Sequence, residues 1–150
     1  MFTVKVDTSG MRRALENFRR ELHEAAQESL RQAAREAQTA AILAIKAQTK
    51  RHTGDLEDNW GQVWLGPYEL RLKNFSGHAD FIEKGTKPHR IQAKRARALA
   101  FQAGGRTIFR RVVNHPGTTP RPFIALAMAS GQMALRDSAT QAVDRLAKAI

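Results

Sequence analysis

The side chains of this 150-residue chain that could do chemistry are five scattered histidines and a group of carboxylates near the middle. No histidine stands in a metal-site spacing such as His-Glu-x-x-His. His89 and His115 each adjoin a proline and could meet in space. Their meeting would permit a two-histidine metal site, but hydrogen bonds that order the loops are the interpretation we favour.

The carboxylates of residues 55–83 could, with a histidine, hold Mg²⁺ for phosphodiester cleavage. Clustered acids on a small domain more often form part of the solvated surface than a metal site. The chain also has no phosphate-binding P-loop, no dinucleotide fingerprint and no Gly-x-Ser-x-Gly elbow. We therefore expect no enzymatic activity and no cofactor, and we treat five acids as a candidate interface: Asp55, Glu57, Asp58, Asp80 and Glu83.

The net charge of +11 is unevenly distributed along the chain. Ten basic residues and no acid lie between positions 84 and 121: Lys84, Lys87, Arg90, Lys94, Arg95, Arg97, Arg106, Arg110, Arg111 and Arg121. In residues 52–83 acids outnumber bases instead. This pattern indicates a surface for nucleic acid, or an acidic face that meets the basic face of the next subunit; a merely solvated basic face is the third interpretation.

Composition limits the class of protein. The chain has no cysteine, so disulfides and thiolate metal sites are excluded. Its start lacks the pattern of a signal peptide, and no run approaches the roughly 18 apolar residues of a membrane span. We expect a soluble protein made in the cytosol, with no membrane partner and one domain over residues 1–150.

A long helix is predicted from Met11 to about Lys50, where the chain has no Pro or Gly. A short strand over Phe2–Val6 precedes it, and Asp7 or Ser9 can cap it. Gly54 is the predicted left-handed stop. The inward stripe repeats every eleven residues: Leu15, Phe18, Leu22, Ala26, Ser29, Ala33, Ala37, Ala40 and Ala44.

Two β-hairpins are predicted between this helix and a second one. The first joins residues 59–65 and 69–75, and the second joins 98–101 and 107–113 around Gly104-Gly105. Residues 84–88 are expected to be irregular, with Phe81 and Ile82 at the start of a loop over the core. A C-terminal helix is predicted from Phe123 to Ile150, with Pro122 at its first turn. The fold class is α+β, with a long N-terminal helix and a C-terminal helix packed on a small, mainly antiparallel sheet.

Several short motifs follow one another along the chain. In order they are Thr53-Gly54-Asp55-Leu56, Ala79-Asp80-Phe81-Ile82-Glu83-Lys84-Gly85-Thr86, Pro88-His89-Arg90-Ile91, Ala98-Leu99-Ala100-Phe101, and His115-Pro116-Gly117-Thr118 with Pro122-Phe123-Ile124. In this order they resemble the tail-component family of long-tailed bacteriophages, whose members are similar to the minor tail protein Z of phage lambda. The resemblance spans about residues 53 to 127. Phe81 and the segment Gln92-Ala93-Lys94 depart from the family's commoner residues, which concerns the subfamily more than the family.

The resemblance implies a virion structural protein, without an enzymatic role, that completes the tail or joins it to the head. Related neck proteins form rings around the DNA passage, so the resemblance implies that copies of this chain assemble with one another, with a hexamer as the working size. The other implied partners are connector or head-completion proteins, tail-tube or tail-terminator proteins, and genomic DNA in the channel. The implied location is the virion neck or tail, and the host cytoplasm during assembly. The basic stretch would face DNA or acidic neighbours.

The same resemblance marks a set of loop residues: Gly54, Gly85, Thr86, Pro88, His89, His115, Pro116, Gly117, Thr118 and Pro122. Gly85 and Gly117 would allow backbone turns with positive φ. We assign five side chains to the core: Phe81, Leu99, Phe101, Phe109 and Phe123. An independent basic nucleic-acid-binding protein remains the alternative function.

Overall fold

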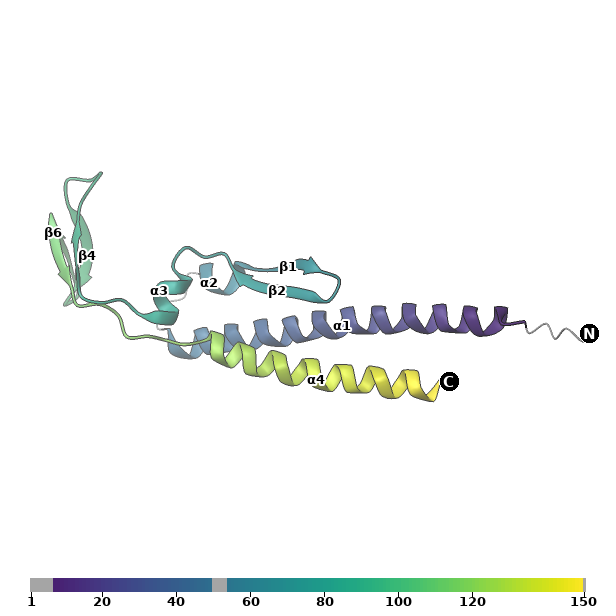
Figure 1. The fold of residues 1–150 in the computed structure, drawn as a ribbon. Helices are drawn as coiled ribbons and strands as arrows, with labels where there is room; N and C mark the ends of the chain where they lie inside the picture. Colours follow the sequence, from purple (N-terminus) through teal and green to yellow (C-terminus); the bar gives the residue numbers. More distant parts are fainter. Residues whose placement is uncertain (1–6, 50–53, 150) are drawn as a thin grey trace, which may run out of the picture. The chain divides into compact units, whose positions relative to one another are not determined.

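The computed structural model describes residues 7–49 and 54–149, and the chain divides into two compact units (Figure 1). Unit 1 combines the chain up to Ser76 with the chain from Phe123 onward, and unit 2 is Gly77–Pro122. Long helices at both ends and small antiparallel sheets confirm the predicted α+β class. One domain over the whole chain stays a prediction.

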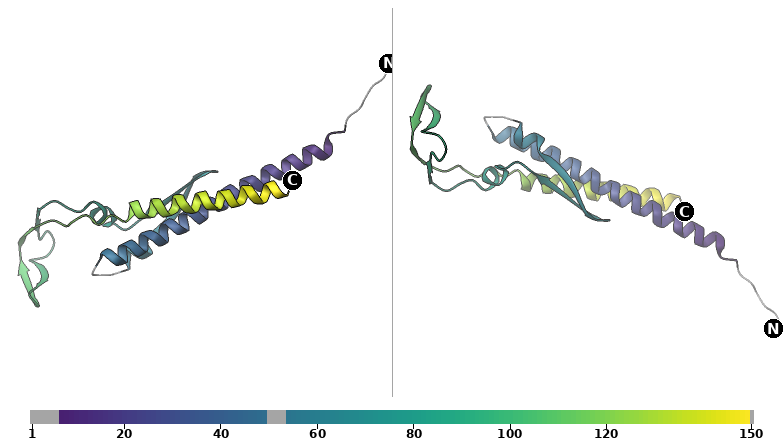
Figure 2. Two further views of the ribbon diagram at one scale, coloured as in Figure 1. Left: turned by 90° about the horizontal axis from the view of Figure 1, so that it is seen from below. Right: turned by 90° about the horizontal axis from the view of Figure 1, so that it is seen from above.

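Unit 1 is built on two antiparallel helices, α1 (Ser9–Gln48) and α4 (Ile124–Lys148), which lie side by side in every view (Figure 2). Small residues let them approach closely. A Cβ added at Gly131 would lie 3.1 Å from Ala37 Cβ. The Ser138 hydroxyl donates a hydrogen bond to Ser29 Oγ over 3.1 Å. The alanine-rich face of α1 is therefore a packing face.

The ends of α1 agree only partly with the prediction. The N-cap is Thr8, which makes no side-chain cap hydrogen bond, and not the predicted Asp7 or Ser9; Asp7 lies one residue earlier and accepts a hydrogen bond from the Ser9 N–H at 2.9 Å. The helix ends at Gln48, since Thr49 is already extended. Gly54 has the predicted positive φ, +83°, but it precedes α2 (Asp55–Asp58), a single turn that the sequence analysis missed. The predicted strand Phe2–Val6 lies outside the described residues.

The first predicted hairpin is confirmed as β1 (Trp60–Gly66) paired with β2 (Glu69–Asn74), in a register that sets Val63 opposite Arg71. It is anchored to α1 by polar contacts. His23 Nδ1 and the Tyr68 hydroxyl are 2.9 Å apart, and the Arg31 guanidinium lies 5.4 Å from the centroid of the Trp64 ring. The hairpin thus forms a second layer on the helix.

The buried apolar side chains among the described residues all belong to unit 1: Ala34, Ala41, Ala44, Ile45, Leu56, Phe123, Ala127 and Ala142. Phe123 is only 1% exposed and meets Trp60 edge to face, as predicted for a core residue. The inward stripe of α1 was wrong at its N-terminal end, where Leu15 is 60% exposed. Its bulky residues lie beyond the end of α4, and no other helix of the described unit covers them.

Unit 2 contains α3 (Ala79–Lys84), β3 (His89–Gln92), β4 (Leu99–Ala103), β5 (Arg106–Arg110) and β6 (Val112–His115). The β4–β5 pair confirms the second predicted hairpin around its glycine turn, but Val112 and Val113, which the prediction included in it, belong to β6 and pair with β3. The β3–β6 pair was not predicted, because it joins segments about twenty residues apart without a hairpin turn. Each sheet has two strands, so the described strands form three small sheets instead of one.

Three predicted core residues of unit 2 are wrong. Phe81 and Phe109 are 60% and 63% exposed, Phe101 is exposed as well, and Leu99 is half-buried. Two-stranded sheets of four or five residues cannot bury a face by themselves. Consequently no described side chain of unit 2 is fully buried.

Two boundaries were also misplaced. Phe81 and Ile82 lie on α3, a helical turn supported by an ion pair of 3.3 Å between Lys84 and Asp80, and not on a loop. Pro122 lies two residues before α4 and outside its first turn. Within the described residues, no helix combines the length and hydrophobicity needed to cross a membrane.

Candidate functional site

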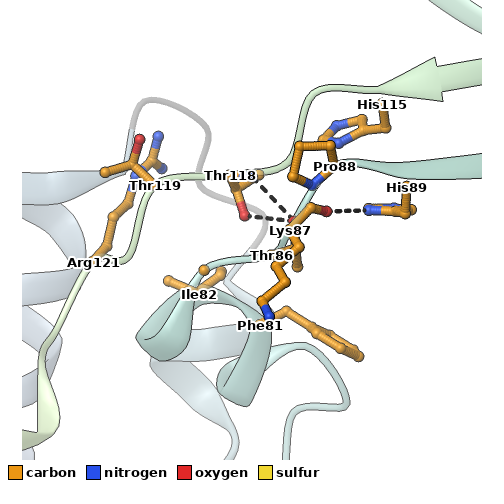
Figure 3. A pocket seen from close by; sticks show the side chains of 11 residues that line it. Phe81, Ile82, Thr86, Lys87, Pro88, His89, His115, Thr118, Thr119 and Arg121 are labelled. Atoms are coloured by element: carbon orange, nitrogen blue, oxygen red, sulfur yellow. Dashed lines mark hydrogen bonds between the residues drawn. The ribbon is translucent and has the colours of Figure 1, made fainter.

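Two motif loops that are far apart in the sequence are joined in unit 2 by a short antiparallel bridge between Thr86 and Thr118 (Figure 3). Each threonine donates its backbone N–H to the other's carbonyl oxygen over 3.0 Å. The two hydroxyl oxygens lie 3.1 Å apart, and the Thr118 N–H also contacts Thr86 Oγ1 at 3.0 Å. We call this pairing, with the flanking Gly85 and Gly117, the clasp.

The glycines of the clasp are required by space as well as by conformation. Gly85 has a φ of +68° and Gly117 a φ of +88°. A Cβ at Gly85 would overlap the carbonyl oxygen of Thr118, and one at Gly117 would overlap the carbonyl oxygen of Thr86. The Arg121 N–H adds a hydrogen bond of 2.9 Å to the Ile82 carbonyl. The two loops therefore hold each other at a distance that only glycine permits.

The structure brings His89 and His115 together, as the sequence suggested it could. They face each other across the β3–β6 pair, with ring centroids 5.1 Å apart and planes tilted by 30°. His89 Nδ1 donates to the Lys87 carbonyl over 2.8 Å, since a carbonyl can only accept. His115 Nδ1 accepts the Gly117 N–H at 3.1 Å. Both rings thus order the loops of the clasp.

Among the described residues, no further potential metal ligand joins these two histidines. The part of the chain that the structure describes contains no group of three or more His, Cys, Asp or Glu side chains arranged for a metal ion. Two histidines with both Nδ1 atoms engaged leave only the Nε2 atoms for other contacts. The loop-ordering interpretation accounts for the geometry of the pair.

A pocket of about 720 Å³ lies on the clasp, entirely within unit 2 (Figure 3). Phe81, Ile82 and Pro88 supply apolar surface, and Lys87 and Arg121 supply positive charge. The residues that line it include three threonines and the two histidines but no carboxylate. Such a lining suits an apolar group that carries negative charge. It offers no carboxylate to orient a histidine as a base.

The ten candidate basic residues all lie in unit 2, and all are exposed. Lys84 is paired with Asp80, and Lys87 and Arg121 line the pocket. The others belong to the strand pairs and the segments that connect them: Arg90, Lys94, Arg95, Arg97, Arg106, Arg110 and Arg111. Unit 2 carries only two acids against these ten bases. The structure therefore concentrates the positive charge on one compact part of the chain.

The candidate acidic residues are divided between the units. Asp55, Glu57 and Asp58 belong to α2 in unit 1, whereas Asp80 and Glu83 belong to α3 in unit 2. Asp55 is already occupied, because its carboxylate accepts hydrogen bonds from the Asn59 amide at 2.7 Å and from the Ser76 hydroxyl. An acidic interface made of all five stays a prediction.

Two carboxyl groups of unit 1 have a lowered pKa, and both lie on or next to α1. The Ser9 hydrogen bonds lower the pKa of Asp7. Hydrogen bonds from Arg35 and then Arg31 lower the pKa of Glu28. Both carboxylates are exposed, so these shifts mark local surface contacts and not a tuned acid or base.

Phe81, Ile82 and Thr119 line the pocket although none of them was predicted as a site residue. The positions of Asp80 and Lys84, four apart, were the available signal for the helical turn that carries Phe81 and Ile82. Scans against protein-family models, curated proteins and solved structures find no match to this chain.

Proposed function

We propose that this chain is a non-enzymatic structural protein of a bacteriophage or prophage particle, which completes the tail or joins it to the head. The observation that carries the proposal is the clasp. The two most distinctive segments of the resemblance, 32 positions apart, hydrogen-bond directly and are kept together by Gly85 and Gly117. The clasp therefore gives one structural reason for the motif residues of both segments.

The incomplete burial of unit 2 also supports a role in an assembly. None of its described side chains is fully buried, and two of its aromatic rings are more than half exposed. A surface of this kind is typical of a segment that a neighbouring subunit covers. The neighbours we propose are further copies in a ring, with six as the working number, and connector, head-completion, tail-tube or tail-terminator proteins. The virion neck or tail is the proposed location.

The test is deletion of the gene from its phage or prophage. We expect heads and tails that accumulate unjoined, or tails that fail to mature, in electron micrographs of lysates. Supplying the wild-type chain from a plasmid should restore joined particles. Joined, infectious particles from the deletion strain would contradict the proposal.

A second function is favoured by a specific observation, the ten exposed Lys and Arg side chains of unit 2. Arginine and lysine on the surface neutralise phosphates and release counterions. A basic protein acting alone on nucleic acid would therefore bind a DNA duplex as a monomer. Its affinity would fall steeply between about 50 and about 200 mM salt.

Replacing Lys94, Arg95 and Arg97 by glutamine tests this alternative. We expect duplex affinity to fall and the slope of log affinity against log salt to decrease by about 2.7, at about 0.9 per lost phosphate contact. Fluorescence anisotropy with a labelled duplex over a salt series measures both.

The matched control changes the same charge on unit 1, by glutamine at the exposed residues Arg12, Arg13 and Arg19. Equal losses for both triple variants would mean that net charge alone acts, without a site on unit 2. Absence of binding by the wild-type chain at low salt would exclude the alternative.

A further inference from the structure

The N-terminal part of α1, residues 9–24, extends past the end of its helical neighbour. The two helices run antiparallel, with the Ser130 hydroxyl donating to the Glu36 carbonyl at 3.5 Å and Ser138 bonded to Ser29. The end of α4 at Lys148 lies near Ala25 and Glu28, where these residues line one shallow pocket. Figures 1 and 2 show α1 continuing beyond this end.

This overhang carries an apolar stripe formed by Met11, Leu15, Phe18 and Leu22, in which Phe18 is half-buried and the other three are exposed. Met11 is 73% exposed, Leu15 60% and Leu22 43%. Ser29, which contacts α4, lies seven residues after Leu22 and hence on the same face. The stripe therefore lies on the same face of α1 that α4 covers from about Ala25 onward. Within the described residues no helix covers the stripe itself.

Most of the stability of a helix in a protein comes from the packing of its apolar face. In the described structure the β1–β2 turn supports the inner end of the overhang, where His23 contacts Tyr68 and Leu22 lines a pocket beside it. A second helix packed against the stripe, beyond the point where α4 ends, would bury the apolar side chains of the overhang.

We propose that this partner is the same stripe of a second copy of the chain, packed antiparallel. The spacing of the four apolar residues is four, three, four, which reads identically in both directions. An antiparallel pair centred between residues 16 and 17 therefore sets Met11 opposite Leu22 of the second copy, and Leu15 opposite Phe18. This alternation of three and four is the spacing of knobs-into-holes packing.

Charge also favours a second copy over a strongly charged partner. Residues 9–24 contain four arginines and three glutamates, so two such segments can approach without a large excess of one sign. Unit 2, with ten bases against two acids, would repel its own copy. The contact is isologous and closes at two copies, so it stands independently of the proposed ring, which would need another surface.

The first test compares the native mass of the wild-type chain with that of Leu15→Glu, by sedimentation over a range of concentrations. We expect a wild-type dimer and an increase of its Kd by about 100-fold in the variant, because the substitution buries a charge. Asn17→Glu is the control, since it adds the same charge at an exposed position between the stripe residues. Circular dichroism checks that all three chains keep their helices.

The second test uses the absence of native cysteine. Met11→Cys and Leu22→Cys are made as separate variants and oxidised alone and as a mixture. The antiparallel pair predicts a disulfide-linked dimer that appears mainly in the mixture. Cross-links confined to each variant alone would indicate a parallel pair and overturn the arrangement.

Other outcomes also overturn the proposal. A monomer at every concentration would do so, as would an assembly of any size that Leu15→Glu leaves intact. The same holds for a monomeric chain that binds lipid vesicles through this stripe. None of these results bears on the deletion phenotype, so the failure of the contact and of the proposed function can be distinguished.

Discussion

Phe123→Ala is expected to lower the free energy of unfolding of unit 1 by about 3–5 kcal/mol. Phe123 is 1% exposed and packs edge to face against Trp60, with ring centroids 6.2 Å apart. Five of the eight apolar residues that are buried in the described parts of the chain are alanines, so Phe123 supplies a large share of their buried surface. Removal of the ring would leave a cavity beside Trp60, and the surrounding structure relaxes into such a cavity only in part.

Urea unfolding followed by tryptophan fluorescence measures this effect, because both tryptophans lie in unit 1. Phe109→Ala is the matched control, since this ring is 63% exposed in unit 2. We expect the control to change the midpoint of the unfolding curve only slightly. A similar loss for both variants would contradict the assignment of the core to unit 1.

Gly117→Ala is expected to open the clasp. The positive φ of +88° costs an alanine about 1 kcal/mol, and the overlap of its Cβ with the Thr86 carbonyl adds about 1–3 kcal/mol. Hydrogen exchange at the Thr86 and Thr118 amides, which form the bridge, should accelerate on the order of 100-fold.

Gly104→Ala is the control, because it places an alanine at positive φ in a turn of unit 2 outside the clasp. Gly104 also has a positive φ, +57°, but a Cβ there meets nothing within 4 Å. It should therefore show only the conformational cost and leave exchange at the threonines nearly unchanged. Equal acceleration in both variants would mean that the threonine amides exchange through unfolding of unit 2 as a whole, and would contradict a local opening of the clasp.

Local signals in the sequence were sufficient for the two long helices and for two hairpins, but not for the short helices α2 and α3. The Pro- and Gly-free run from Met11 predicted α1 to within two residues at its start. The glycines at 104 and 105 placed the β4–β5 turn, and both have positive φ. Such elements depend on neighbours in the chain, and composition therefore reveals them.

Burial was predicted less well, because it depends on where other elements end. The stripe containing Leu15 and Leu22 has the spacing of an inward face, yet both residues are exposed where α4 no longer accompanies α1. Phe81 and Phe109 are apolar but belong to a unit with no covering layer. Periodicity identifies a face without identifying its partner.

The α+β class, the two long helices, two of the strand pairs and the run of ten bases can be recognised from local patterns in the chain. The pairing of Thr86 with Thr118, the contact of His89 with His115 and the exposure of Leu15 and Leu22 on α1 follow from the packing of distant segments. The reason is physical: helical periodicity and turn propensity act over a few residues, whereas pairing across 32 positions depends on how the whole chain packs.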